Sequence, residues 1–197
     1  MRVLFVSFIV LIIDQLTKLF IKGVSISFLN INFPGMGYGE RLPVIGNLFG
    51  ITFVENPGIA FGIDFGADYK VLISFLTLAV SIGMLVYLYF IRNKSLLMRL
   101  SLALIIGGAF GNLIDRMFYG IIYNYAPMMQ GKVVDFFDIN FLNFYMFNKT
   151  FGSYIFNVAD VAVTAGIVLL LFAYNGEAYD ESEKEVSLNN CLVENKD

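Results

Sequence analysis

Four apolar segments, each about as long as a lipid bilayer is thick, constrain the fold of this chain more than any other feature. They cover residues 3–21, 70–90, 96–118 and 154–174. A helix needs about 20 residues to cross the hydrocarbon core of a membrane. The composition agrees, because 58% of the residues are hydrophobic, 15% are charged and the mean hydropathy is +0.74. We therefore predict an all-α membrane protein with four transmembrane helices, forming a single domain over residues 1–175.

The first apolar segment could instead be a signal peptide, because Arg2 precedes it. No A-x-A-like cleavage site follows, however, and the run continues past Asp14 and Lys18 to Ile21. We therefore expect a first transmembrane helix that is retained.

The short connection between the second and third segments sets the expected orientation. It is basic over residues 92–99, and such connections face the cytoplasm. Both termini then lie in the cytoplasm, and the long connections at residues 23–69 and 119–153 lie outside. The acidic tail over residues 176–197 is expected to be cytoplasmic and disordered.

The two long connections have different compositions. The first contains a β-strand pattern over residues 48–54, followed by a break at Asn56-Pro57-Gly58, which predicts a small sheet lying on the membrane surface. The second is dense in Phe, Tyr, Met and Asn over residues 136–156, a composition typical of the membrane interface.

With this topology, the polar residues of the first, third and fourth segments all fall at one depth, near the outer face. One shared site at that depth explains the agreement most simply, since ionisable groups inside a membrane are costly and usually functional. The residues concerned are Asp14, Lys18, Asn112, Asp115, Arg116, Asn157 and Asp160.

Several kinds of chemistry are excluded by what the chain lacks. It has no His and a single Cys, Cys191, so zinc sites, His- or Cys-based catalysis and an internal disulfide are not expected. We predict no cofactor and no metal. The net charge is only −3 and much of the acid sits in the tail, so nucleic-acid binding has no support.

Some of these polar residues have a structural explanation as well as a functional one. Asp14 and Lys18 are four residues apart and can form a self-contained helical ion pair or support the site. Asn112 and Asp115 share a helix face and favour a structural polar network over direct catalysis. The glycines before them are expected to let another helix approach closely; they are Gly107, Gly108 and Gly111.

Asp135 and Asp160 are the best candidates for catalysis. Asp135 precedes the return of the chain into the membrane, and Asp160 lies one to two turns into the fourth segment. If the two carboxyl groups meet in a low-dielectric pocket, they cannot easily both ionise and will share a proton. One can then act as a base on water while the other acts as an acid towards a scissile carbonyl.

The residues alone leave other hypotheses open. Asp135 could be an interfacial surface carboxylate, and Asp160 could be the proton or ion site of a small transporter. A non-enzymatic scaffold is disfavoured, because it would leave the intramembrane carboxylates unexplained. The transporter hypothesis lacks an internal repeat or a polar path across the bilayer.

Five ordered motifs resemble those of bacterial lipoprotein signal peptidase, also called signal peptidase II or prolipoprotein signal peptidase. They span nearly the whole membrane portion of the chain, which makes the resemblance specific. The motifs are DQLTK at 14–18, ENPGIAFG at 55–62, GGAFGNLIDR at 107–116, VVDF at 133–136 and FNVAD at 156–160.

The resemblance implies an intramembrane aspartyl endopeptidase of the cytoplasmic membrane that cleaves prolipoproteins just before a diacylglyceryl-modified cysteine. It implies an extracytoplasmic β-cradle within residues 23–69, an interfacial helix within residues 119–153, membrane lipids as partners and inhibition by globomycin-type cyclic peptides. Asp135 and Asp160 match the catalytic pair. The matching supporting or substrate-binding positions are Asp14, Lys18, Asn56, Gly58, Gly108, Asn112, Asp115, Arg116, Asn157 and Ala159.

Overall fold

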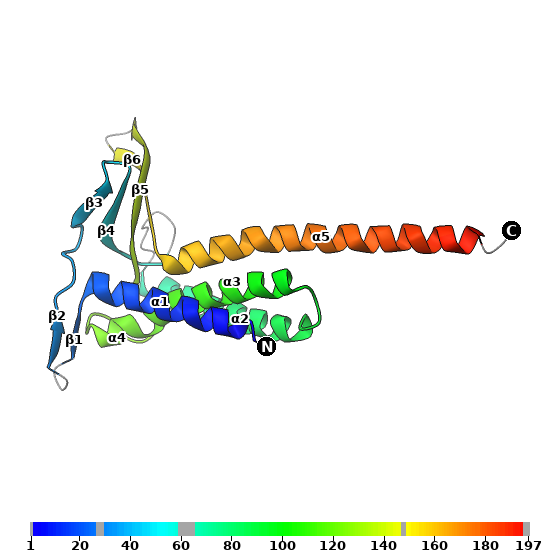
Figure 1. The fold of residues 1–197 in the computed structure, drawn as a ribbon. Coiled ribbons are helices and arrows are strands. Elements are labelled where there is room, and N and C mark those ends of the chain that lie inside the picture. The colour runs from blue at the N-terminus through cyan, green and yellow to red at the C-terminus, as the bar shows by residue number, and fades with distance from the viewer. Residues whose placement is uncertain (1, 27–29, 59–65, 147–148, 195–197) are drawn as a thin grey trace.

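The computed structural model describes residues 2–26, 30–58, 66–146 and 149–194. Its four long helices are α1 (Leu4–Lys22), α2 (Ala67–Phe90), α3 (Leu96–Ile114) and α5 (Val158–Glu194). All four contain a stretch long and apolar enough to cross a membrane. Figure 1 shows the helices running along a common direction, with the strands gathered at one end. The prediction of a mostly helical membrane protein with a small sheet is confirmed.

The helices expose large apolar side chains on their outer faces. Phe5 and Phe20 of α1 are 68% and 63% exposed, and Phe172 of α5 is 67% exposed. In water such surfaces would be unfavourable, whereas lipid tails solvate them without cost. Serine hydroxyls within the helices donate hydrogen bonds to backbone carbonyls rather than to solvent. Ser7 Oγ, for example, donates to Ala103 O at 2.7 Å. These are the features expected of helices surrounded by hydrocarbon.

Helix α3 is central because it packs against α1, α2 and α5. Glycines permit two of these contacts. A Cβ on Gly107 would lie 2.8 Å from Ser7 O of α1, and a Cβ on Gly108 would lie 2.3 Å from Ala159 O of α5. The predicted packing role of these glycines is therefore confirmed.

After Ile114 the third helix widens into one π-helical turn, η3 (Asp115–Tyr119), and ends in α4 (Gly120–Ile122). Such turns often occur at functional sites, because the extra residue redirects the side chains around it. Asp115 and Tyr119 are both buried here.

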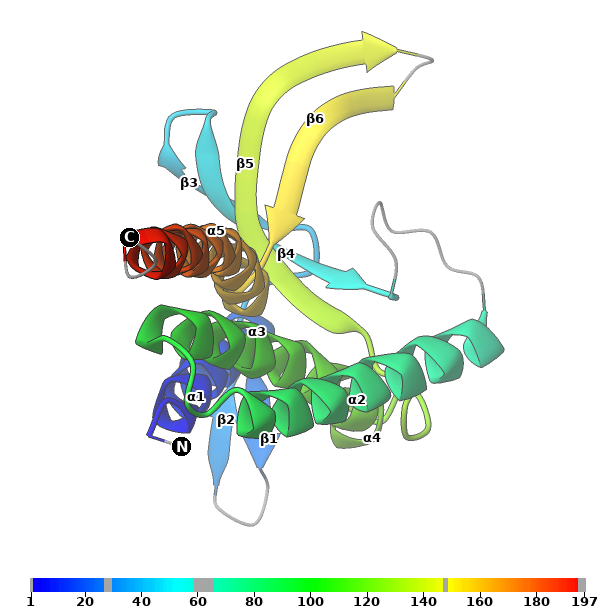
Figure 2. The ribbon, with the colours of Figure 1, turned by 90° about the vertical axis from the view of Figure 1, so that its right-hand side faces the viewer.

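The sheet joins the two long connections. Its antiparallel order is β3 (Arg41–Ile45), β4 (Phe49–Asn56), β5 (Val133–Met146) and β6 (Lys149–Phe156). A separate hairpin consists of β1 (Val24–Ile26) and β2 (Ile31–Phe33). In Figure 2, β5 and β6 curve together above the helices, beside β3 and β4. Antiparallel pairing of β4 with β5 brings residues 49–56 beside residues 133–139.

Two expectations for the connections need correction. The strand predicted at residues 48–54 is present as β4, but half of the sheet comes from the second connection. An interfacial helix was expected there, whereas its described residues form β5 and β6, with only the three-residue α4 before them. Aromatic and β-branched residues favour strands, which accounts for the difference. The fourth helix consequently begins at Val158, because 154–156 belong to β6.

The tail also differs from the expectation. Helix α5 continues to Glu194, so the backbone of residues 176–194 is helical rather than irregular. The segment contains Glu, Ala, Lys and Leu, which are strong helix formers, and it prolongs a helix that has already been nucleated.

We predict that Gly108→Ala destabilises the protein by about 1–3 kcal/mol, because the added methyl group must push α5 away from α3. Gly83→Ala is the matched control, since a Cβ at Gly83 meets nothing within 4 Å. Thermal unfolding in detergent measures the difference. Equal stability of the two variants would contradict the glycine-mediated contact.

Candidate functional site

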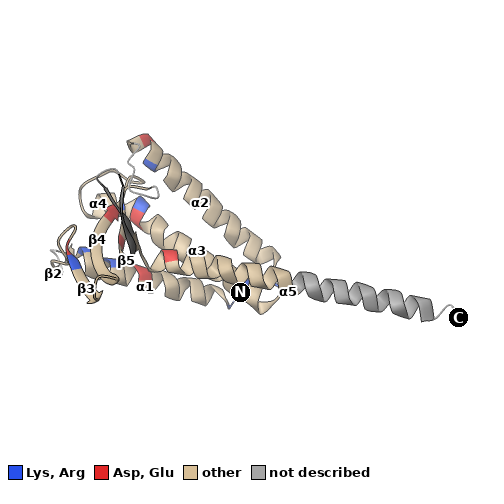
Figure 3. Ribbon diagram, turned by 90° about the horizontal axis from the view of Figure 1, so that it is seen from above, with Lys and Arg blue, Asp and Glu red and all other residues tan. Residues whose placement is uncertain are grey.

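The polar residues of three helices meet at the end of the bundle that carries the sheet. Figure 3 shows the acidic residues of the described helices gathered towards that end. The side chains are deeply buried: Asp14, Lys18, Asp115 and Asn157 are 0% exposed, and Asp135 is 4% exposed.

The Lys18 ammonium lies at the centre of this cluster. Its Nζ is 2.9 Å from Asp14 Oδ2 and 2.8 Å from Asp115 Oδ2. It also donates to Asn112 Oδ1 at 2.8 Å. These contacts match the three donors of an ammonium group. The Asp14–Lys18 pair is therefore part of a larger network rather than self-contained.

The two acidic partners of Lys18 also hold backbone groups of other elements. Asp14 Oδ1 accepts the N–H of Ala159 at 2.9 Å, which fixes the first turn of α5 against α1. A negative charge is favourable there, because the first N–H groups of a helix have no internal partner. Asp115 Oδ2 accepts the N–H of Val134 at 3.1 Å and so fixes the start of β5.

The FNVAD motif forms a reciprocal cap at the start of α5. Asn157 Oδ1 accepts the N–H of Asp160 at 3.0 Å, and Asp160 Oδ2 accepts the N–H of Asn157 at 3.1 Å. This is the capping-box arrangement with an amide and a carboxylate. Asn112 Nδ2 donates to the other oxygen, Asp160 Oδ1, at 2.9 Å. Both oxygens of Asp160 are thus oriented by fixed donors.

Asp135 approaches Asp160 from the sheet. Asn157 Nδ2 donates to Asp135 Oδ1 at 2.6 Å, so Asn157 touches both carboxylates. Asn56 Nδ2 of β4 donates to Asp135 Oδ2 at 3.2 Å. Asn56 is held in turn by its Oδ1, which accepts the N–H of Gly58 at 3.0 Å. Gly58 has a φ of +133°, a conformation that favours glycine.

The pKa of Asp135 is raised from its usual value to about 7, first by burial and then by the charge of Asp160. Hydrogen bonding from Asn56, the charge of Lys18 and hydrogen bonding from Asn157 lower this pKa and offset part of the rise. A carboxyl group with a pKa near 7 can exchange a proton at neutral pH, which general acid–base catalysis requires.

Arg116 has an unused donor close to this pair. Its Nε is buried and has no hydrogen-bond partner among the described residues. Its guanidinium interacts electrostatically with both Asp135 and Asp160. A buried donor without a partner is costly, so a ligand that supplies an acceptor would be favoured here.

Gln15 was not among the predicted site residues, although it lies within the DQLTK motif. Gln15 Nε2 donates to Asp115 Oδ1 at 2.9 Å and to Gly111 O at 3.1 Å. Its Oε1 accepts the Tyr119 hydroxyl at 3.1 Å. The sequence feature that could have identified Gln15 is its position beside Asp14 in an apolar segment. A polar side chain inside a membrane requires hydrogen-bond partners, as a charged one does.

Each residue predicted for the site from the sequence lies in this region of the structure. Residues 59–62 of the ENPGIAFG motif lie outside the described part of the chain. In that part, no three His, Cys, Asp or Glu side chains come together as metal ligands. The site holds two carboxyl groups that both accept hydrogen bonds from Asn157, beside an arginine with an unused donor. Asp160 accepts from the backbone N–H of Asn157, and the buried Asp135 accepts from its side-chain amide. Such a site can move a proton between two carboxyl groups and polarise a bound carbonyl.

Comparisons with known proteins point to one family of membrane peptidases. A family model described as signal peptidase (SPase) II matches residues 6–175. The chain is 34% identical over 175 residues to a lipoprotein signal peptidase of Pelodictyon phaeoclathratiforme, covering 87% of this chain and 90% of the relative. It is 36% identical over 170 residues to a lipoprotein signal peptidase of Moorella thermoacetica, covering 86% and 90%.

Two solved structures are similar as well. A bacterial membrane enzyme solved by the in meso method at 2.3 Å resolution superposes with a TM-score of 0.63 at 27% identity, over 91% of this chain and 90% of that one. Another, at 1.9 Å resolution, gives a TM-score of 0.59 at 30% identity, over 88% and 92%. These similarities favour the peptidase hypothesis over the transporter and the scaffold.

We predict that Lys18→Met destabilises the protein by about 3–5 kcal/mol, because it leaves the carboxylates of Asp14 and Asp115 buried without a cation. Adding Asp115→Asn should restore part of the loss, since one uncompensated charge is then removed. Arg92→Met, at an exposed cation in the α2–α3 connection, is the control. Unfolding in detergent provides the comparison, and equal losses for Lys18→Met and the control would disprove the central role of Lys18.

Proposed function

The chain belongs to the signal peptidase II family, and we propose that it is an aspartyl peptidase whose catalytic pair is Asp135 and Asp160. The observation that carries the proposal is Asn157, whose backbone N–H donates to Asp160 and whose side-chain amide donates to Asp135. Two carboxyl groups oriented by one buried residue form a pair that can share a proton.

In the proposed mechanism, Asp135 holds the shared proton and Asp160 is the base. The charge of Asp160 contributes to the raised pKa of Asp135, which is about 7, and this favours the assignment. Asp160 takes a proton from a water molecule, whose oxygen attacks the scissile carbonyl. Asp135 gives its proton to the carbonyl oxygen, and a tetrahedral diol results. Collapse of the diol breaks the C–N bond as a proton passes to the leaving amine.

Four neighbouring residues support these steps. The Asn112 side-chain amide and the Asn157 backbone N–H fix Asp160 through hydrogen bonds that an ionised carboxylate accepts. Arg116, through its unused Nε donor, binds the carbonyl oxygen of the substrate and stabilises the negative charge that develops on it. Lys18 acts indirectly. It donates a hydrogen bond to Asn112 Oδ1 and so orients the Asn112 side-chain amide, whose Nδ2 donates to Asp160.

The proposed substrates are prolipoproteins, which would be cut just before a diacylglyceryl-modified cysteine. Lipid chains and the apolar signal helix hold such a substrate in the bilayer, so the scissile bond lies near the membrane surface. Asp135 and Asp160 lie at the sheet end of the helices, a depth suited to that bond. The basic α2–α3 connection favours cytoplasmic termini and a site near the outer face of the bacterial cytoplasmic membrane. Globomycin-type peptides would compete for the same site.

We predict that Asp135→Asn and Asp160→Asn each reduce cleavage by at least about a thousandfold, because each removes one partner in proton transfer. Asp68→Asn, at an exposed carboxylate in the first turn of α2, is the control. A gel-shift assay with a prolipoprotein, with and without diacylglyceryl modification, measures the effect. Activity of either folded variant near that of wild type would refute the catalytic assignment. Cleavage of the unmodified substrate at the same rate would refute the proposed specificity.

The proposed roles also predict a pH dependence. Because Asp135 must be protonated, kcat/KM should fall as the pH rises through about 7, the pKa of this group. Asn56→Ala removes a hydrogen bond that lowers the pKa of Asp135, so the alkaline limb should move to higher pH. A profile of kcat/KM from pH 5 to 9 would test this, and movement of the limb to lower pH would exclude Asp135 as the acid.

A further inference from the structure

A second buried lysine, Lys22, lies one helical turn beyond Lys18, at the end of α1. It forms an ion pair with Glu55 Oε1 of β4. The two side chains are only 7% and 16% exposed, so the pair is largely removed from solvent. Because residues four apart share one face of a helix, Lys18 and Lys22 extend from the same face of α1.

Three tyrosines surround the Lys22 ammonium group. Its Nζ lies 4.0 Å from the ring centroid of Tyr123, 4.7 Å from that of Tyr125 and 5.6 Å from that of Tyr119. Such cation–π contacts are attractive, and more so away from water. The Tyr123 hydroxyl donates to Gly23 O at 2.7 Å, which ties its ring to the end of α1. Lys22 is therefore held in place on the α1 side, and Glu55 is the group that it holds.

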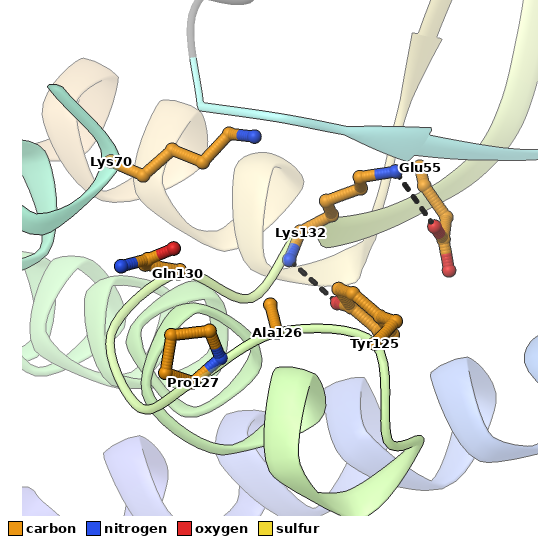
Figure 4. Close-up of a pocket in the computed structure, with 7 residues that line it drawn as sticks. All are labelled: Glu55, Lys70, Tyr125, Ala126, Pro127, Gln130 and Lys132. Carbon is orange, nitrogen blue, oxygen red and sulfur yellow. Dashed lines mark hydrogen bonds and ion pairs between the residues drawn. The ribbon is translucent and has the colours of Figure 1, made fainter. Parts of the chain in front are cut away.

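Lys132 is a second cation beside Glu55, but its contact is looser. Its Nζ is 3.6 Å from Glu55 Oε2, and its side chain is 37% exposed. Figure 4 shows this contact at the wall of a cavity, where the Lys132 backbone N–H donates to the Tyr125 hydroxyl at 2.8 Å. Exposed ion pairs contribute little to stability, whereas a buried pair that loses one partner leaves an uncompensated charge. Lys22 is therefore the main partner of Glu55.

Glu55 immediately precedes Asn56, which contacts Asp135. Asn56 Nδ2 donates to Asp135 Oδ2 at 3.2 Å, and Glu55 pairs with Val134 across the two strands. Successive residues of a strand face opposite sides. Glu55 therefore fixes β4 from one face of the sheet, while Asn56 acts on the aspartate from the other face.

Given the catalytic pair of the proposed function, on which this step rests, we propose that Lys22 is a positioning residue: its ion pair with Glu55 holds β4 where Asn56 donates to Asp135. Without Lys22, the Glu55 carboxylate is buried without its main cation and moves towards Lys132 or solvent. This movement displaces the β4 backbone and weakens the hydrogen bond from Asn56.

Lys18 and Lys22 then act on different aspartates. Lys18 donates to Asn112, whose side-chain amide donates to Asp160. Lys22 acts on Asp135 through β4. Because both lysines extend from one face of α1, this helix sets the relative position of the two carboxyl groups, and transfer of a proton between such groups requires a fixed geometry.

The test is a titration of Asp135 in the full-length protein in detergent, followed by infrared spectroscopy. The band of its protonated carboxyl group is identified by its absence from Asp135→Asn. The charged groups that act on Asp135 are Asp160 of α5, Lys18 of α1 and Arg116 of η3. None of these three is changed in the variants, so the midpoint of the titration reports on the contact from β4.

We expect Lys22→Met and Glu55→Gln each to raise the midpoint by about 0.5 pH unit, because the hydrogen bond from Asn56 lowers the pKa of Asp135 and is weakened in both. The direct charge effects of the two changes have opposite signs, so shifts in the same direction identify the positioning role. Lys22→Arg keeps the cation and should titrate close to wild type. Lys132→Met is the matched control and should leave the midpoint unchanged.

The decisive comparison is the same pair of changes in an Asn56→Ala background, where neither should move the midpoint further. Midpoint shifts of opposite sign, or equal shifts with and without Asn56, would overturn the positioning role of Lys22. The pH profile of kcat/KM for a diacylglyceryl-modified prolipoprotein is measured on the same variants. An infrared midpoint that moves while the kinetic limb stays in place would support the positioning role and refute Asp135 as the catalytic acid, so the two failures are distinguishable.

Discussion

The fold depends on one fully buried cation, Lys18, and on the groups that compensate it. An ammonium group inside a membrane protein is costly unless charge and hydrogen bonds replace its water. Asp14 and Asp115 supply the charge, and Asn112 supplies a third acceptor. Since these residues come from α1 and from α3 with its π-helical turn, the lysine fixes both helices at one register. Asp14 then carries the constraint to α5 through the N–H of Ala159.

The candidate site is made largely from groups that the backbone needs in any case. Asn157 and Asp160 cap the first turn of α5, where the free N–H groups of a helix start require acceptors. The same cap holds the Asp160 carboxylate ready for chemistry and leaves the Asn157 amide free to donate to Asp135. Structural and proposed catalytic roles therefore coincide, and for this reason stability must be measured beside activity in each variant.

Much of this arrangement could be predicted from the sequence, because membranes limit what a chain can do. The length of the apolar segments predicts the spans, and the shared depth of Lys18, Asn112 and Asp160 predicts one site. The strand pairing could not be predicted in the same way. Residues 133–156 are aromatic enough for either an interfacial helix or strands, and only pairing with β4 decides between them. Gln15 was missed because a neutral side chain gives a weaker signal than a charge.

The β4–β5 pair places two different kinds of contact on its two faces. Glu55 and Asn56 are neighbours in the chain, yet they face opposite sides of the pair, Glu55 towards Lys22 and Lys132 and Asn56 towards Asp135. A slip of β4 by one residue would exchange the two faces, so the ion pairs of Glu55 and the hydrogen bond of Asn56 require the same register. Since Asn56 donates a hydrogen bond that lowers the pKa of Asp135, the register of β4 against β5 also sets proton exchange at the candidate site.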